Sequence, residues 1–179
     1  DSAQRYAQEP DFGRWGHRLE IFGLDLRHTP SVEALCRRLL QTLPRLDFIV
    51  NNACQTVRRP PEFYAHMMDG ERAALQHMPA GVKQLLGTYD SAGDGAVAAR
   101  NGLSDGLNHA AELSQIPLLA EDMVGQKHLF PEGRLDQDLQ QVDLRGRNSW
   151  RLLMAEVSSV ELLEVQLINA VAPFIINAR

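Results

Sequence analysis

The sequence predicts an α/β fold with a parallel sheet, and three observations lead to this class. Strand-like apolar segments at residues 18–27 and 46–50 flank a helix-like segment, and the connections are short. This order is typical of a right-handed βαβ unit in a parallel sheet. Near the carboxyl end a second helix-like segment is apolar nearly all round, so we expect it to be buried by the sheet.

Composition fits one globular domain and disfavours several classes of partner. The chain has 179 residues, of which 44% are hydrophobic and 23% charged. A formal net charge of -5 and the lack of a basic stripe disfavour nucleic acid. Two cysteines, Cys36 and Cys54, are too few for a disulfide framework, which indicates a reducing compartment. Seeing no bilayer-spanning run and no signal peptide, we expect a cytoplasmic protein without a membrane partner.

The first half of the chain contains the predicted βαβ unit. Residues 2–8 read as the end of a helix, and 18–27 as a strand. Thr29 is a plausible N-cap, with Pro30 at the first helical position. The following helix runs to Pro44 and carries an apolar stripe made of Val32, Leu35, Leu39, Leu40 and Leu43.

Residues 55–147 read as an insertion. Two stretches, 58–68 and 70–78, could form short helices, whereas 89–106 is small, polar and glycine-rich and predicts a mobile loop. Two interpretations of the first stretch stay open, namely a lid over a substrate and a helix packed on the sheet edge. The side chains that would form such a lid are Arg58, Arg59, Phe63, Tyr64 and Met67.

The last predicted helix begins near Ala155 and contains a proline. Apolar residues repeat there at helical spacing, and beyond Leu162 they surround the helix, which predicts burial on more than one side. Pro173 has no N–H, so the carbonyl of Asn169 loses its intrahelical partner. A buried polar group of this kind requires a water or a ligand.

Polar side chains follow both predicted strands. Asp25 lies at the end of the first strand, and Asn51 and Asn52 directly follow the second. Ligands of open parallel sheets bind outside the carboxyl ends of the strands, so these residues mark a candidate site. Purely structural roles are the competing interpretation, because Asp25 could occupy a turn and the asparagines could cap a strand.

Three motifs together resemble the short-chain dehydrogenase/reductase family. They are "LDLR" with Asp25, "VNNAC" in place of the family's Asn-Asn-Ala-Gly, and "INAVAPF" with Asn169. Their order is the family's order, and the resemblance covers residues 2–54 and about 148–179. The stretches "NNACQTVRRPP" and "NSWRL" resemble a subset of that family that has a long insertion.

The resemblance implies a fold, a reaction and a set of site residues. The fold would be a Rossmann-like doubly wound parallel sheet, and the reaction hydride transfer between NAD or NADP and a carbonyl or alcohol substrate. Asn169 would be the catalytic residue, holding through its main-chain carbonyl the water of a proton relay. The residues implied on the adenosine side of the cofactor are Asp25, Leu26, Asn51, Asn52 and Ala53.

The chain also departs from the family pattern. Cys54 replaces a glycine, and neither the glycine-rich turn nor the Tyr-x-x-x-Lys motif is present. We therefore expect residues 1–179 to be one Rossmann-like domain, incomplete at both ends and interrupted by the insertion at 55–147. Alone, this chain is expected to be inactive.

Other expectations concern partners and alternatives. The helix over 155–179 is expected to form a homo-oligomer. The six histidines lack the pairing on a helix face that a zinc site needs, so no metal is expected. Two alternatives remain open. The first is a non-catalytic nucleotide-binding or protein-interaction module, and the second is an unrelated α/β domain with coincidental motifs.

Overall fold

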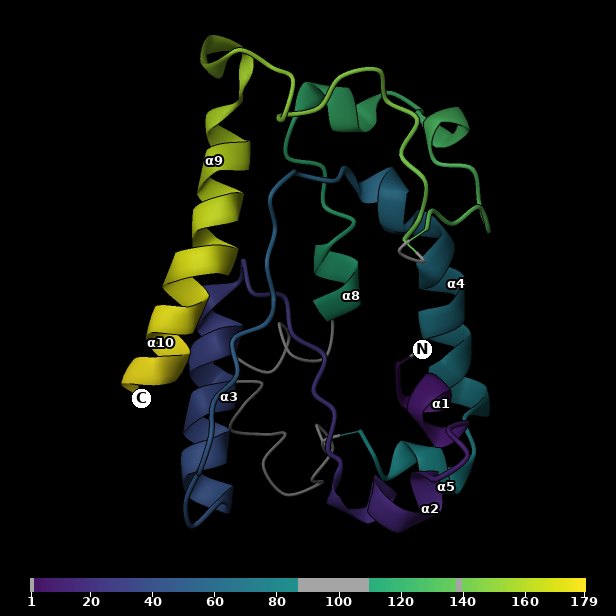
Figure 1. Ribbon diagram of the computed structural model, residues 1–179, viewed down its shortest axis with the longest axis vertical. Coiled ribbons are helices and arrows are strands. Elements are labelled where there is room, and N and C mark those ends of the chain that lie inside the picture. Colours follow the sequence, from purple (N-terminus) through teal and green to yellow (C-terminus); the bar gives the residue numbers. More distant parts are fainter. Residues whose placement is uncertain (1, 87–109, 138–139) are drawn as a thin grey trace.

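Two groups of helices, joined by extended segments, make up the computed structural model, which describes residues 2–86, 110–137 and 140–179 (Figure 1). The first group contains α3 (Thr29–Thr42) and a long helix near the carboxyl end of the chain. That long helix consists of α9 (Ser159–Gln166), η6 (Leu167–Val171) and α10 (Ala172–Ala178), and α10 packs against α3.

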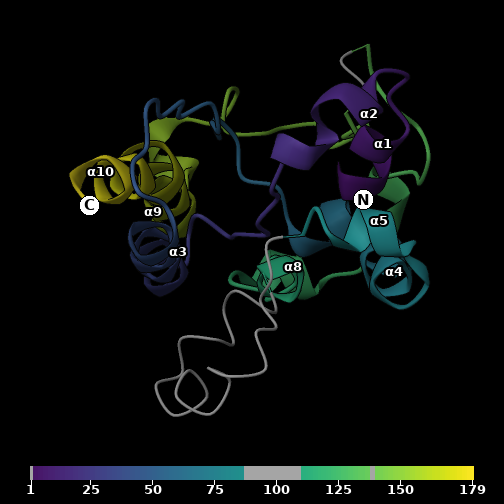
Figure 2. The same ribbon diagram turned by 90° about the horizontal axis from the view of Figure 1, so that it is seen from below.

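The second group lies on the other side of the molecule, as both views show (Figures 1 and 2). It contains α1 (Ser2–Ala7), α2 (Phe12–Trp15), α4 (Pro61–His77) and α5 (Ala80–Lys83). The short helix α8 (Ala110–Leu113) lies between the groups. The remaining described helices are single turns at Gly16–Arg18, Ala120–Met123, Lys127–Leu129 and Met154–Glu156.

The helices predicted on either side of the first strand-like segment are confirmed. Residues 2–7 form α1, and α3 follows the predicted span closely. The N-cap of α3 is His28 rather than Thr29, so Pro30 stands one position deeper in the first turn than expected. Ser31, Val32 and Cys36 are buried on the inner side of α3.

The predicted parallel sheet is wrong for the described residues. Segments 19–28 and 43–60 run in the same direction on either side of α3 in the chain, but neither forms a strand (Figure 1). Pairing is limited to isolated bridges, Ile21 with Leu86 and Leu135 with Gln141. The order of extended segment, helix and extended segment was therefore predicted, but not its hydrogen bonding.

The physical reason is that a strand needs a partner for its backbone and a surface for its apolar side chains. Two strands alone are marginally stable in water, and the described chain offers the pair no third strand. Residues 46–50 consequently lie open, with Phe48 87% and Val50 84% exposed. The apolar character of residues 46–50 therefore does not lead to burial of their side chains.

The long helix begins later and is less buried than expected. Ser158 is its N-cap, accepting a hydrogen bond from the Glu161 amide, and α9 starts at Ser159. The burial predicted around it by a sheet is wrong, because Leu163 is 61% and Phe174 70% exposed. Over Ser159–Ala178 this helix is long and apolar enough to cross a membrane, so the expectation of no bilayer-spanning run is wrong by length and composition; the core helix of a soluble protein passes the same test.

A π-helical turn stands just ahead of Pro173. Between Leu167 and Val171 the helix widens, and the Ala172 amide donates to the Leu167 carbonyl, five residues earlier. A missing N–H at a proline disturbs the regular bonding pattern, and single π turns are a common way to accommodate this. The helix then continues as α10.

The insertion differs from its prediction in one respect. Where the sequence indicated two short helices at 58–68 and 70–78, the structure has the single helix α4. The glycine-rich stretch at 89–106, predicted to be a mobile loop, lies outside the described residues.

Candidate functional site

Asp25 and Leu26 lie in a tight turn that leads into α3. The Asp25 carboxylate accepts a hydrogen bond from the Arg27 amide at 2.9 Å, and the His28 amide donates to the Asp25 carbonyl at 3.0 Å. This aspartate turn is the structural role that the sequence left open. The turn also holds Asp25 and Leu26 at the edge of a cavity.

This cavity, called the Asp25 cavity below, has a volume of about 230 Å³. Its walls come from segments far apart in the chain, namely the Asp25 turn, the segment after the two asparagines, α4, α8 and the long helix. Its lining residues are Leu24, Asp25, Leu26, Arg27, Gln55, Arg59, Tyr64, Ala110, Ser114, Glu164 and Ile168. All three motifs that carry the family resemblance thus contribute a residue of their own or an immediate neighbour.

Asn169 joins two of those motifs through its side chain. Its amide nitrogen donates to the Gln55 carbonyl at 2.7 Å, and its amide oxygen accepts from the Gln55 N–H at 2.9 Å. An asparagine amide matches a main-chain donor and acceptor in this way because it carries one of each type. These two bonds use one of the two N–H donors and one of the two oxygen lone pairs of the Asn169 side chain, and they fix its orientation.

Asn51, Asn52 and Ala53 do not line the Asp25 cavity. All three are exposed, and Asn51 donates to the side chain of Asn177 in α10 at 3.2 Å. The structure therefore brings Asp25 and Leu26 together with the neighbours of Asn169, while Asn51 contacts α10 instead.

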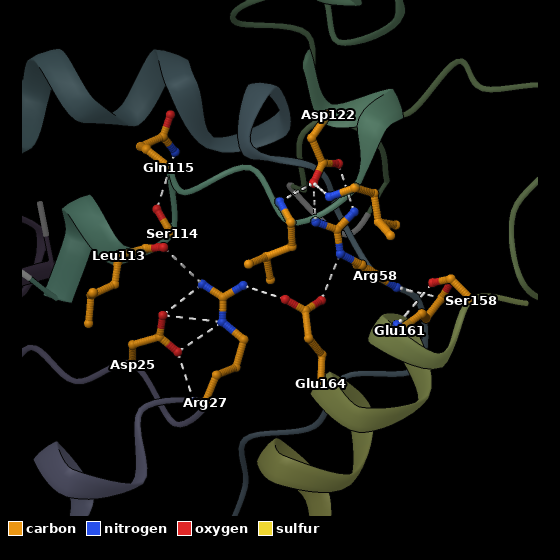
Figure 3. Close-up of polar contacts among 12 residues, drawn as sticks. Asp25, Arg27, Arg58, Leu113, Ser114, Gln115, Asp122, Ser158, Glu161 and Glu164 are labelled. Atoms are coloured by element: carbon orange, nitrogen blue, oxygen red, sulfur yellow. Dashed lines mark hydrogen bonds and ion pairs between the residues drawn. The ribbon is translucent and has the colours of Figure 1, made fainter. Parts of the chain in front are cut away.

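A chain of alternating charges runs from Asp25 into the insertion (Figure 3). Arg27 binds Asp25 on one side and Glu164 on the other, each at 2.7 Å. Glu164 also lies 2.9 Å from the Arg58 Nε, as an ion pair outside hydrogen-bond geometry. Arg58 ends the chain on Asp122, whose side chain is fully buried.

The charged side chains in this row of ion pairs stabilise one another in their ionised forms. The hydrogen bond that the Arg27 guanidinium donates to Asp25 raises the pKa of Arg27, although burial opposes it. Burial alone would raise the pKa of Asp122, but hydrogen bonds from Arg58 and two backbone amides outweigh it and lower that pKa. A buried charge persists when it is paired and hydrogen-bonded, as these are.

A second charge cluster stands near Arg59. Asp143 is shared by two guanidinium groups, that of Arg59 and that of Arg145, which binds it at 2.8 Å. Each guanidinium also lies over an aromatic ring, Arg59 over Phe63 at 5.0 Å and Arg145 over Phe130 at 5.7 Å from the ring centre. These contacts fix the position of both arginines.

Tyr64 adds a phenol to the wall of the Asp25 cavity. Burial raises its pKa, so its hydroxyl stays protonated at neutral pH and can donate a hydrogen bond. Among the described residues this hydroxyl has no hydrogen-bond partner. The residues considered for a lid therefore take different positions. Arg59 and Tyr64 line the cavity, whereas Arg58 and Phe63 are buried.

A second, more polar cavity of about 210 Å³ is lined in part by Arg58. The stretches "VRRP" and "NSWRL" both contribute to its walls. The Ser149 hydroxyl is buried there and has no hydrogen-bond partner in the described part of the chain. Within that part, no group of histidine, cysteine, aspartate and glutamate side chains could hold a metal ion.

Sequence reasoning missed Arg27 and Glu164, which form the centre of the site. One signal for Glu164 was present, because it is a lone acidic position in the apolar part of a helix and therefore needs a cation if buried. Arg27 had no such signal, since arginine in a turn is ordinary.

Comparison with known protein families, curated proteins and solved structures found no match for this chain.

Proposed function

We propose that this chain supplies the adenosine-binding part of an NAD(P)-dependent oxidoreductase with the activity of the short-chain dehydrogenases/reductases. The observation that carries the proposal is the Asp25 cavity, because all three resembling motifs contribute to it or adjoin it. Residues 24–27, Gln55 and Ile168 lie far apart in the chain yet line one space. The proposal does not include a parallel sheet.

The turn offers adenine a matched pair of polar groups. The Asp25 carboxylate, which also accepts from Arg27, is an acceptor, and the neighbouring Leu26 amide is a donor without a partner among the described residues. An adenine ring presents an amino donor beside a ring-nitrogen acceptor, which complements such a pair. Leu24, Leu26 and Ile168 supply apolar surface for its faces.

Other residues would orient rather than react. When bound, the nicotinamide cofactor supplies the hydride chemistry. Asn169 keeps the Gln55 segment against the long helix, and Pro173 leaves its main-chain carbonyl without the usual helical donor, so a relay water has an acceptor there. The substrate class under this proposal is a carbonyl or alcohol.

A non-catalytic interaction module is the second candidate, and one observation favours it. Apolar side chains are exposed both on segment 46–50 and along the long helix, including Phe48, Leu163 and Phe174. Large exposed apolar surface marks a binding face for another protein. Such a module would form complexes without requiring a nucleotide.

Calorimetric titration of the full chain with NAD and NADP, oxidised and reduced, tests the first proposal. We expect binding, and we expect Asp25→Asn to weaken it by about tenfold or more, since hydrogen bonds to charged groups contribute about 1.5 to 3 kcal/mol. Asp47→Asn is the matched control, because Asp47 is exposed and pairs only weakly with Arg45 at 3.2 Å. Absence of binding by all four nucleotides would refute the proposal and favour the interaction module.

A further inference from the structure

The second, more polar cavity, called the Ser149 cavity below, is separate from the Asp25 cavity. Its volume is about 210 Å³, and the two cavities share no lining residue. Its walls come mainly from residues 57–60, the single turn Ala120–Met123, residues 145–152 and the first turn of α9. Sites for drug-sized ligands usually measure about 300 to 1,000 Å³, so this cavity suits a smaller molecule.

The charged side chains that line the Ser149 cavity balance one another. Three are guanidiniums and three are carboxylates, namely Arg58, Arg145, Arg147, Glu121, Asp122 and Glu161. Each guanidinium already binds a carboxylate. Arg58 binds Asp122 within the wall (Figure 3), whereas Arg145 and Arg147 bind carboxylates that do not line the cavity, at 2.8 and 2.7 Å. An anion would have to displace one of these carboxylates, and a cation would lie beside three guanidiniums, so the charges favour a neutral ligand.

Hydrogen-bonding groups of both kinds are left unused on this wall. Among the described residues, the Glu121 carboxylate accepts no hydrogen bond, and Glu161 accepts one, from the Arg58 amide at 2.9 Å, through Oε1 alone. On the donor side, Arg147 does not use its Nε, and Asn148 uses its side-chain oxygen but not its amide nitrogen. The wall therefore offers both donors and acceptors to a ligand.

The Ser149 hydroxyl is the group on this wall that most needs a partner. Its oxygen is shielded from solvent, yet no described residue forms a hydrogen bond with it. Buried hydroxyl groups in proteins are nearly always hydrogen-bonded. Because Ser149 lines the cavity, a molecule held there can supply the missing partner.

We propose that the Ser149 cavity binds a small neutral molecule that carries several hydroxyl groups, of the monosaccharide or cyclic polyol class. Each hydroxyl of such a ligand both donates and accepts, so the ligand matches unused groups of both kinds without adding charge. Its C–H groups can lie against the apolar part of the lining, which consists of Val57, Pro60 and Leu152. Binding here is independent of the proposed nucleotide site, because the two cavities share no lining residue.

The test titrates the isotope-labelled full chain with glucose, galactose, mannose and myo-inositol, each added separately and followed by nuclear magnetic resonance. We expect at least one of them to shift the backbone amide signals of Gln126, Asn148 and Ser149 together, with a Kd of about 1 mM or lower. The signal of Leu26, in the Asp25 cavity, should stay in place. The charged probes putrescine and inorganic phosphate should shift none of these signals. This titration needs no variant, so it decides the proposal even if a substitution prevents folding.

Variants locate the binding. Ser149→Ala should weaken the probe that binds by about fivefold or more, without lowering the urea midpoint of unfolding, because the hydroxyl has no partner among the described residues. Glu121→Gln keeps an acceptor but removes the charge, so the affinity for a neutral probe should change by less than about threefold. Ser2→Ala is the control, since Ser2 is exposed and does not line the Ser149 cavity, and it should leave the affinity unchanged.

Three results would overturn the proposal. Unchanged signals with all four neutral probes would show that the cavity holds water only. Tighter binding of putrescine or phosphate at Gln126, Asn148 and Ser149 would show that the ligand is charged. Equal probe affinity of the wild type and Ser149→Ala would exclude the Ser149 hydroxyl from binding.

Discussion

Replacing Glu164 by glutamine tests whether the buried charge chain stabilises the fold. Glu164 is 4% exposed and lies between Arg27 at 2.7 Å and Arg58 at 2.9 Å. Glutamine has nearly the same shape but no charge, so two guanidiniums would face each other across a neutral amide. Removing one partner of a buried ion pair costs about 3 to 5 kcal/mol. We expect the lower end, because Arg27 is partly exposed and the amide oxygen still accepts a hydrogen bond.

Urea denaturation followed by circular dichroism measures this cost. A loss of about 3 kcal/mol is a large share of the total stability of an ordinary domain, which is about 5 to 15 kcal/mol. Glu156→Gln is the matched control, because Glu156 pairs with Arg147 at the exposed surface and its loss should change stability little. If both variants unfold at the same urea concentration, the charge chain does not stabilise the fold and the reasoning is wrong.

Three further predictions concern acid stability, the Asn169 contact and the long helix. Because the pKa of Asp122 is lowered in the folded chain, the carboxylate stabilises the fold fully above the ordinary aspartate pKa of about 3.9, and this stabilisation is lost as the pH falls below that value. In unfolding experiments at a series of pH values, Asp122→Asn should therefore reduce the loss of stability at acid pH. Asn169→Ala removes both hydrogen bonds to Gln55 and should destabilise the chain by about 1 to 2 kcal/mol in urea, whereas an unchanged midpoint would deny the contact any role. Phe174→Glu places a charge on the exposed face of the long helix, so it should dissociate any homo-oligomer seen by analytical ultracentrifugation; a wild-type monomer at all concentrations would contradict that expectation.

What could be predicted from the sequence was local. The helix over 29–42 follows from an apolar stripe, a proline in its first turn and Pro44 beyond its end, all within one short segment. Pro173 alone predicts that the helical hydrogen bonding is disturbed at Asn169. The π turn over Leu167–Val171 includes that residue.

What could not be predicted depends on contacts across the chain. The apolar stretch at 46–50 shows that these residues can form a strand, but not whether a partner strand is present. Glu164 is equally undecided in sequence, because its role is set by Arg27 and Arg58, which lie more than a hundred positions away. The hydrogen bond between the Asn169 side chain and the Gln55 backbone could not be predicted for the same reason, because the two residues lie far apart in the sequence.

Nuclear magnetic resonance titration of the isotope-labelled chain with NADP tests the central claim most directly, because it reports where a nucleotide binds. We expect the backbone amide signals of Leu26, Gln55 and Tyr64 to shift together and to saturate at one affinity, while that of Asp47 stays in place. Signals that stay in place throughout, or that shift only away from the Asp25 cavity, would contradict the account.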